Sequence, residues 1–398
     1  MSHHSKLSRK QTVISALVIG AVVTAVVLWM AVYDFVPEAP DRFIYDWKVS
    51  LLSTRIKAQR KDIALIYVDD KSLSDYFAIT PVDRALLAEL IRAVDAAKPK
   101  VIGLDVVFDR PSEPDRDEAL ITALREVAAP VVMVATDIQE RGVSGNRIAW
   151  QASYLQRTNN MIASPFLGTE DNEFFLGDDV IRSMEPMDQV PSQKLPFALV
   201  LAQYAGIHNY PQSRIIDWLL PSENGTEPFQ TFIVPPHKKV SGTLNGEAVL
   251  PAFMQRFLKN RIVIIGANII GVDRHRVPMT VATNSDVPGA YIHAQILAQI
   301  IDGREIRNLP VLFEIPLIFF ASFFLVLIAE RYGDDHRLLL EFCLFAGIFT
   351  VGALMFWFAR INSPSATLLL AWLLVAFFGK YGTKITGRLF RKLENRGG

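Results

Sequence analysis

Residues 310–329 read PVLFEIPLIFFASFFLVLIA, an apolar run that contains one charged side chain, Glu314. About 20 apolar residues are enough to cross the hydrocarbon core of a bilayer as an α-helix. Three other stretches have the same character, at residues 12–33, 338–359 and 366–381. With the run extended to 310–330, the sequence predicts four transmembrane helices, one near its start and three near its end.

One span before residues 34–309 and three after them place both termini on one side and the long segment on the other. Basic residues near the spans mark the cytoplasmic side. They are Lys6, Arg9, Lys10, Arg331, Arg337, Lys380, Lys384, Arg388, Arg391, Lys392 and Arg396, whereas the loop 360–365 before the last span has one base. Residues 1–11 and the basic tail 382–398 are therefore expected in the cytoplasm. The segment 34–309 is expected outside, in the periplasm if this is a multi-pass protein of a bacterial inner (plasma) membrane.

The first apolar run could instead be a cleaved signal peptide, because it follows a basic start. Signal-peptide cores are about 7–15 residues long, and this run is longer. No clear pattern of small residues for cleavage follows Tyr33. Retention as a membrane anchor is therefore the preferred interpretation.

Composition narrows the function classes. The chain has 398 residues, 51% of them hydrophobic, and equal numbers of acidic and basic residues. The zero net charge does not suggest a nucleic-acid partner. The single cysteine, Cys343, lies in the third predicted span, so the external segment has no disulfide. No Cys/His spacing typical of a zinc site occurs, and neither a metal nor a cofactor is expected.

Short apolar runs alternate with amphipathic segments in the external part. The strands are expected at residues 63–68, 101–108, 130–135 and 261–266. The helices are expected at 86–94 after Asp83, from Asp115 to 127, and at 194–206 and 288–301. This alternation predicts an α/β domain with a largely parallel sheet flanked by helices. Residues 138–191 and 217–246 are irregular, and we expect loops, short antiparallel strands and a hairpin there. A further helix over 41–52 places Phe43, Trp47 and Leu51 on one face.

Five acidic residues follow the expected parallel strands. They are Asp69, Asp70, Asp105, Asp109 and Asp273, and Arg84 or Arg274 could pair with them. Ligands of open α/β sheets bind beyond the carboxyl ends of the strands, so these residues form a candidate ligand pocket. A hard cation such as calcium also prefers oxygen ligands. Helix caps and buried Asp–Arg pairs are the more conservative interpretation, and a catalytic carboxylate pair is the least favoured.

Other motifs have structural interpretations that are preferred over functional ones. Residues 266–271 space two glycines as a phosphate loop does, but Val272 and Asp273 stand where Lys and Ser or Thr are required. They are expected to form a tight turn. His275 and His293 lack partners at metal-ligand spacing, and His293 is expected to pack against the sheet. The membrane-depth acids Glu314 and Glu341 lie near span ends, and each is expected to pair with a base or reach the interface.

Several of these residues carry a resemblance to a known family. They are Ile63–Asp70 with Ser72, Leu73, Pro81, Asp83 and Arg84; residues 100–108 with the acidic stretch 113–117; residues 177–182; and residues 261–273 with 287–294. Over about residues 41–308 the chain resembles the second type of the extracellular sensory domains named for cyclases and histidine kinases, the CHASE class. Three spans after the domain are also the usual layout of this family.

The resemblance implies a sensor, and commonly a homo-oligomer. Family members carry a cytoplasmic cyclase, kinase or phosphodiesterase after the last span, whereas here only a short basic stretch follows Gly379. We therefore expect a receptor subunit that binds a ligand or partner outside and signals through its helices. Another protein supplies the output, unless the sequence is truncated before an output domain. A scaffolding subunit of a membrane complex is the alternative. No reaction constellation is evident, so an enzyme is not expected.

Overall fold

A computed structural model describes residues 8–33, 39–74, 82–136, 145–168, 179–184, 195–236, 239–240, 243–244, 256–281, 283, 285–332 and 334–394. Pro81, Gly177 and Asp178 of the family resemblance lie outside these residues, as does much of the irregular segment 138–191. The chain divides into two compact units, Ser53–Glu305 and Met1–Leu52 with Ile306–Gly398. We call them the external unit and the membrane unit, and each is described by itself.

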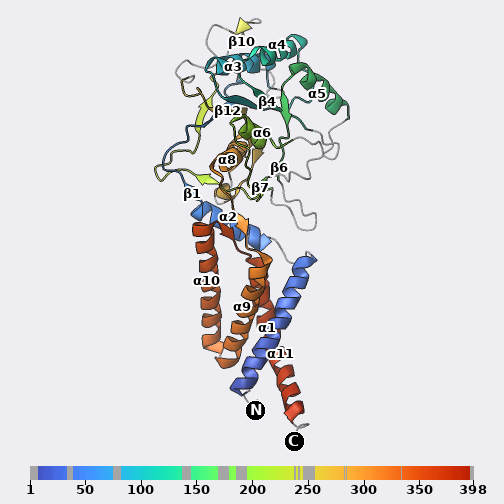
Figure 1. The fold of residues 1–398 in the computed structure, drawn as a ribbon, viewed down its shortest axis with the longest axis vertical. Helices are drawn as coiled ribbons and strands as arrows, with labels where there is room; N and C mark the ends of the chain where they lie inside the picture. The colour runs from blue at the N-terminus through green and yellow to red at the C-terminus, as the bar shows by residue number, and fades with distance from the viewer. Residues whose placement is uncertain are drawn as a thin grey trace. The chain divides into compact units, whose positions relative to one another are not determined.

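The external unit is built on one six-stranded sheet (Figure 1). Its order is β5 (Met161–Ala163), β4 (Val131–Val134), β3 (Val101–Asp105), β12 (Ile262–Asn268), β2 (Ile63–Asp69) and β9 (Gln230–Ile233). Every neighbouring pair is parallel. The strongest apolar runs of the sequence form the three central strands, because both faces of a parallel sheet are buried. The predicted fold class is confirmed.

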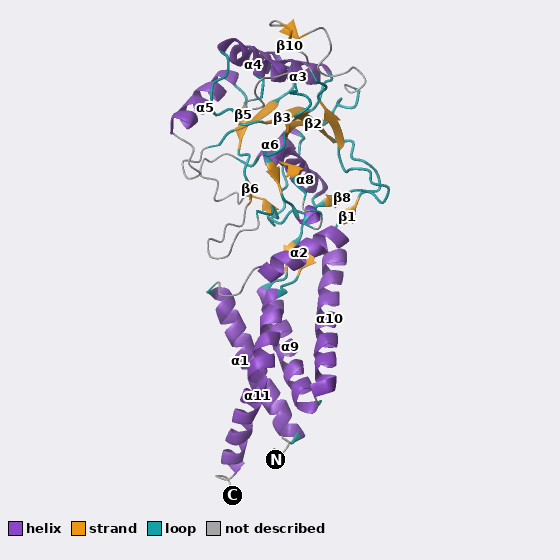
Figure 2. Cartoon of the chain, turned by 180° about the vertical axis from the view of Figure 1, so that it is seen from behind, coloured by secondary structure: helices purple, strands orange, loops and turns teal. Residues whose placement is uncertain are grey.

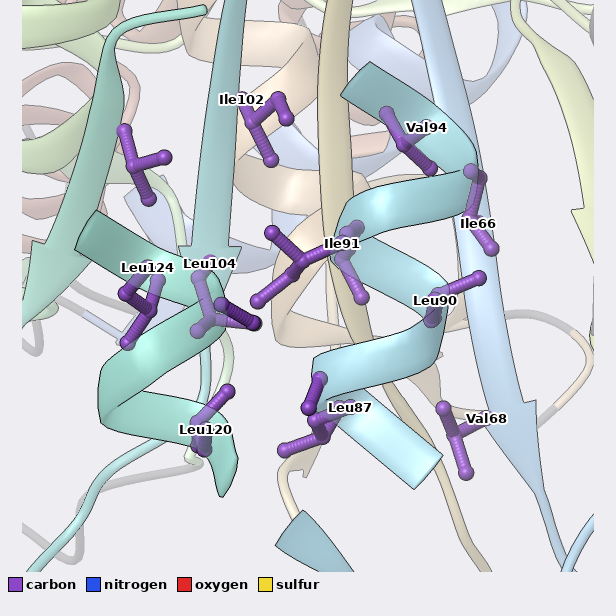
Figure 3. Close-up of a cluster of buried hydrophobic side chains, with 14 of the residues drawn as sticks. Ile66, Val68, Leu87, Leu90, Ile91, Val94, Ile102, Leu104, Leu120 and Leu124 are labelled. Atoms are coloured by element: carbon purple, nitrogen blue, oxygen red, sulfur yellow. The ribbon is translucent and has the colours of Figure 1, made fainter. Parts of the chain in front are cut away.

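Helices cover both faces of this sheet. Helix α3 (Arg84–Ala96) is capped by Asp83, which accepts a hydrogen bond from the Leu86 amide at 2.9 Å. It packs with α4 (Pro114–Glu126) over alternate residues of the strands, such as Ile66 and Leu104 (Figure 3). On the opposite face, Gly103 of β3 and Gly266 of β12 leave room for α6 (Phe197–Tyr204) and α8 (Gly289–Asp302). Since strand side chains alternate between faces, two layers of helices enclose the sheet.

These glycines are required by close packing. A Cβ on Gly103 would lie 2.7 Å from the Phe197 ring, and one on Gly266 would lie 2.6 Å from the Ala290 Cβ. Such distances are too short for two carbon atoms in contact. The approach at Gly266 brings the first turn of α8 against the central strand, near its carboxyl end.

Short elements surround the sheet. Two antiparallel pairs are β6 (Leu167–Gly168) with β7 (Ser183–Met184) and β10 (Lys239–Val240) with β11 (Thr243–Leu244). They confirm the short antiparallel strands and the hairpin expected from the sequence. Strands β1 (Thr54–Arg55) and β8 (Leu219–Leu220) form a parallel pair, and β13 (Arg274–His275) pairs antiparallel with β14 (Val287–Pro288).

Two elements differ from the sequence prediction. Helix α5 (Gly145–Thr158) occupies a segment where only loops and short strands were expected. Its buried face is partly polar and includes Gln151 and Thr158, so the apolar pattern is weak. Strand β9 is the parallel edge strand of the sheet rather than part of a hairpin. Its burial alternates, which is typical of an edge strand and less distinctive than a buried apolar run.

The membrane unit contains α1 (Arg9–Val32), α2 (Ala39–Leu52), α9 (Val311–Arg331), α10 (Asp334–Ala359) and α11 (Ala366–Glu394) (Figure 2). Among the described residues, three helices are long and apolar enough to cross a membrane. They are α1, α9 and most of α10. Helix α11 bends by 57° between Gly379 and Tyr381 and adds a fourth span if its two parts act as one.

Helices α1, α9 and α11 share one apolar core. Residues from each helix are fully buried in it, including Ala16, Ile318 and Ala371. The Ser15 and Thr386 hydroxyls are 2.7 Å apart, so the start of α1 lies beside the second half of α11. Glu341 of α10 accepts a hydrogen bond from Arg337 at 2.6 Å, which confirms the predicted pairing with a base.

Candidate functional site

The carboxyl ends of β3 and β12 open into a cavity of about 410 Å³ within the external unit. Its apolar lining includes Val106, Phe166, Ile181 and Ile269. Its polar lining consists of Asp105, Asp109, Arg110, Asp273, His275 and His293. The volume falls within the range of about 300–1,000 Å³ that is typical of small-molecule sites. We call this space the edge cavity.

Asp105, the last residue of β3, and His293, from the second turn of α8, form the buried part of this lining. The exposed fractions of these residues are 8% and 3%. The Asp105 Oδ1 lies 3.9 Å from the His293 Nε2, which is too far for a direct hydrogen bond. The Oδ2 of Asp105 has no hydrogen-bond partner among the described residues. A residue of the cavity lining therefore carries a buried carboxyl oxygen with unused hydrogen-bonding capacity.

Burial also decides the charge of this pair. It raises the pKa of Asp105 well above its ordinary value, and the neighbouring Asp273 carboxylate raises it further. Burial lowers the pKa of His293 to about 4, although Asp273 opposes that change. Both changes in pKa favour the uncharged forms of the two groups, a carboxylic acid beside a neutral imidazole. Such a surface offers a hydrogen-bond donor and acceptors without a net charge.

Asp273 lies opposite, at the N-terminus of α8. Its carboxylate contacts the His275 Nε2 at 3.0 Å, and its carbonyl accepts the Gly289 amide at 3.0 Å. A Cβ on Gly289 would lie 2.6 Å from an Asp273 carboxylate oxygen. The φ of Asp273 is +48°, in the left-handed region that aspartate tolerates better than most residues. Gly289 therefore leaves the space that the Asp273 carboxylate occupies.

Asp109 is the third predicted acid in the lining. Its carboxylate pairs with Arg147 of α5 and with the Arg110 Nε at 3.2 Å. Its charge is therefore compensated within the protein. The structure brings Asp105, Asp109 and Asp273 together, as the sequence predicted from their positions after the strands.

The other predicted site residues lie elsewhere and make structural contacts. Asp69 accepts hydrogen bonds from the Ser72 amide and hydroxyl at 2.8 and 2.9 Å, and Asp70 accepts one from the Ile270 amide at 3.1 Å. Arg274 donates to the Asp286 carbonyl at 2.5 Å and to the Asn268 side chain. These contacts stabilise turns and loops, and they are neither the helix caps nor the buried Asp–Arg pairs of the conservative interpretation.

Arg84 is the clearest structural residue of the set. It is 1% exposed and pairs with Asp117 of α4, rather than with any of the five predicted acids. Its guanidinium also lies 4.9–5.3 Å from the ring centroids of Phe108, Trp150 and Tyr154. This cation–π cage and ion pair join α3, α4 and α5.

The glycine turn after β12 forms a tight turn into a loop, as expected. The Val272 amide donates to the Ile269 carbonyl at 3.1 Å, and Gly271 has a φ of +76°. No helix begins there, so the turn lacks the helix N-terminus of a phosphate loop. No three His, Cys, Asp or Glu side chains within the described ranges are arranged to hold a metal ion.

Sequence reasoning discounted two residues that line the cavity, His275 and His293. Neither has a metal-ligand partner at regular spacing, and their positions depend on the β13 turn and on α8. The resemblance contained a usable signal, because its most specific piece includes Asp273, Gly289, Ala290 and His293. The structure shows why these residues belong together: Gly289 leaves room for Asp273, Ala290 packs on Gly266, and His293 faces Asp105.

The fold defines a parallel α/β domain that is joined along the chain to helices able to cross a membrane. The profile of the CHASE2 domain matches residues 19–329. Because that match covers most of the chain, the protein belongs to the CHASE2 family, and it is a multi-pass membrane protein with an extracytoplasmic CHASE2 domain. No curated protein and no solved structure gave a significant match.

Proposed function

We propose that this protein is a receptor subunit whose external unit binds a small organic molecule in the edge cavity. The observation that carries the proposal is Asp105, a residue of the cavity lining whose buried Oδ2 has no hydrogen-bond partner among the described residues. Leaving a buried polar group unsatisfied costs about 1–3 kcal/mol. A ligand that hydrogen-bonds to Asp105 removes that cost, so the site favours an occupant.

The lining limits the class of ligand. Burial favours the uncharged forms of Asp105 and His293, whereas Asp273, at 38% side-chain exposure, adds a carboxylate. Apolar side chains line the rest, among them Val106 and Phe166. A neutral or cationic molecule with hydroxyl, carbonyl or amine groups fits this combination better than an anion does. Binding without catalysis is part of the proposal.

Transmission inward is proposed to begin at α8. This helix carries His293 and ends at Gly303, which has a φ of +62°, and α9 begins at Val311. Arg60 pairs with Asp302 at 2.6 Å and anchors the end of α8. A ligand that shifts His293 therefore acts on the helix that precedes the second span. Output through a second copy or another protein follows from the family resemblance.

The proposed topology places both termini in the cytoplasm of a bacterial cell. The contact between Ser15 and Thr386 supports it, because it places the start of α1 beside the end of α11. The basic residues at both ends, such as Arg9 and Arg388, agree with the orientation rule. Reporter fusions after Glu394 test it directly: cytoplasmic activity is expected, and periplasmic activity of the fusion contradicts it.

Binding is tested with the full chain in lipid nanodiscs. Thermal unfolding is measured against a panel of neutral, cationic and anionic metabolites. We expect at least one neutral or cationic compound to raise the unfolding temperature. Asp105→Leu should abolish that effect, while the control Asp70→Asn, outside the cavity, should keep it. Stabilisation that survives Asp105→Leu contradicts the site, and a stable hetero-complex with no small-molecule response favours the scaffolding alternative.

A further inference from the structure

A second cavity, of about 400 Å³, lies within the membrane unit. Its lining comes from α9, α10, α11 and α2, and includes Leu317, Leu344, Gly347, Leu368 and Lys48. All the lining is apolar or small except for Lys48 and the serines of the α10–α11 loop. We call it the membrane cavity. It is separate from the edge cavity and from the proposed receptor function.

The cavity exists because α10 packs loosely. The apolar core shared by α1, α9 and α11 receives only the partly buried Leu344 and Ile348 from α10, whose fully buried Phe356 packs instead against Tyr45 of α2. A Cβ added at Gly347 would meet no atom within 4 Å, so this glycine borders open space. An apolar void loses dispersion contacts on every side, and an acyl chain of the bilayer can restore them.

Chain topology gives the depth of the cavity. Helix α9 follows the extracytoplasmic domain directly, and α10 returns across the membrane, so the α10–α11 loop lies on the extracytoplasmic side. Ser363 and Ser365 of that loop line the cavity. The cavity therefore lies at the level of the extracytoplasmic leaflet.

Helix α2 agrees with this depth. Phe43, Trp47 and Leu51, at four-residue spacing, are 59%, 44% and 65% exposed. An amphipathic helix with an exposed aromatic row lies in the membrane interface. The opposite face is fastened to the loop, because the Asp41 carboxylate accepts the Ser365 and Ala366 amides at 2.5 and 2.7 Å. Lys48 on this face is thus held at headgroup level.

The ammonium group of Lys48 is the polar end of the site. Lys48 is 6% exposed, and its Nζ donates to the Asn362 Oδ1, the Ser363 carbonyl and the Ser363 Oγ at 3.2, 3.3 and 3.4 Å. No carboxylate within the described residues forms an ion pair with it, although the Asp41 carboxylate is near enough to oppose the effect of burial on its pKa. Burial lowers its pKa to about 8, which an adjacent anion would reverse. A buried cation beside an apolar cavity matches an anionic amphiphile.

We propose that the membrane cavity binds one acyl chain of an anionic phospholipid from the extracytoplasmic leaflet, with its phosphate at Lys48. The chain fills the space beside Gly347. The three acceptors that bond to Lys48 are neutral, and the nearby Asp41 carboxylate is bonded to the Ser365 and Ala366 amides, so the ammonium group remains able to pair with the headgroup. The lipid then fills the space between α10 and the apolar core of α1, α9 and α11, against which α10 packs only Leu344 and Ile348.

Native mass spectrometry of the delipidated full chain tests this proposal. The protein is offered equal amounts of dioleoyl phosphatidylglycerol and dioleoyl phosphatidylcholine. We expect one retained lipid, with phosphatidylglycerol preferred. Lys48→Met, which keeps the length of the side chain, should reduce that preference about tenfold, the change expected when one charge-assisted contact is lost.

Gly347→Phe tests the cavity itself. It should abolish retention of the lipid because the ring occupies the acyl-chain space, whereas the control Gly347→Ala should retain it. An unchanged unfolding temperature and elution volume confirm that the variants are folded. Equal retention of both lipids by the wild type, or full retention by Gly347→Phe, overturns the proposal. Binding of a free fatty acid in place of phosphatidylglycerol overturns the headgroup assignment.

Discussion

The state of His293 leads to a measurable pH dependence. Its pKa is about 4 in the folded protein, against 6.5 in an unfolded chain. Between these values the unfolded chain takes up a proton that the folded domain excludes, so acid favours unfolding through this group. Its stabilising contribution is complete above pH 6.5 and is lost as the pH falls to 4. Because a change of one in pKa is worth about 1.4 kcal/mol, the loss is about 3 kcal/mol.

Asp105 hides this effect in the wild type. Its raised pKa keeps a proton on the folded protein that the unfolded chain releases, so acidification through the same range adds stability. Asp105→Asn removes that opposing contribution and keeps the size of the side chain. The informative comparison is therefore between Asp105→Asn and the double variant Asp105→Asn/His293→Gln. Other titrating groups near the pair, Asp273 and His275, are present in both.

The assay is urea unfolding of the full chain in detergent, followed by fluorescence, with the buried Trp218 as a reporter of the external unit. The difference in free energy of unfolding between the two variants should be constant above pH 6.5. It should fall by about 3 kcal/mol towards pH 4. Parallel profiles of the two variants across this range refute the conclusion that burial holds His293 neutral.

Three further predictions concern single side chains. Arg84→Met should destabilise the external unit by about 3–5 kcal/mol in the same urea assay, because it leaves the buried Asp117 carboxylate without its ion-pair partner. The control Arg92→Met removes an exposed ion pair and should change stability by less than about 1 kcal/mol. Gly289→Ala should lower the free energy of unfolding by about 1–3 kcal/mol and should weaken stabilisation by ligand, because the added methyl group displaces the Asp273 carboxylate. The control Gly145→Ala adds a methyl group with no atom within 4 Å and should have neither effect. Asp41→Ala should lower the stability of the membrane unit by about 1 kcal/mol through loss of the α11 cap, and Asp41→Asn should restore most of it when thermal unfolding in detergent is compared.

The architecture was largely predictable because burial leaves a strong pattern. Strands β2, β3 and β12 are apolar on both faces, and α3 and α8 show apolar residues at helical spacing. Helix α5 was missed because its buried face contains Gln151 and Thr158. Strand β9 was missed because an edge strand is buried on one face only. The bend in α11 beside Gly379 was not predicted, because composition alone does not show where a helix changes its direction.

The candidate site was predictable in part. The carboxyl ends of neighbouring parallel strands lie at one edge of a sheet, so acids that follow such strands are expected to lie close together. This reasoning places Asp105, Asp109 and Asp273 in one lining, as the structure does. It cannot separate them from Asp69 and Asp70, whose carboxylates bond to local turns. It also cannot find the Arg84 pair with Asp117, which requires the packing of α3 against α4. The pairing of Asp105 with His293 depends on residues far apart in the sequence.

Histidine NMR tests the central claim, ligand binding in the edge cavity, most directly. The full chain is labelled at its histidine rings, and His293 and His275 are assigned by substitution to Gln. The compound that most stabilises the protein in the metabolite panel is then titrated. We expect saturable shifts of the His293 and His275 resonances, with His208 outside the cavity unchanged. Saturable binding that leaves both resonances unmoved contradicts the account.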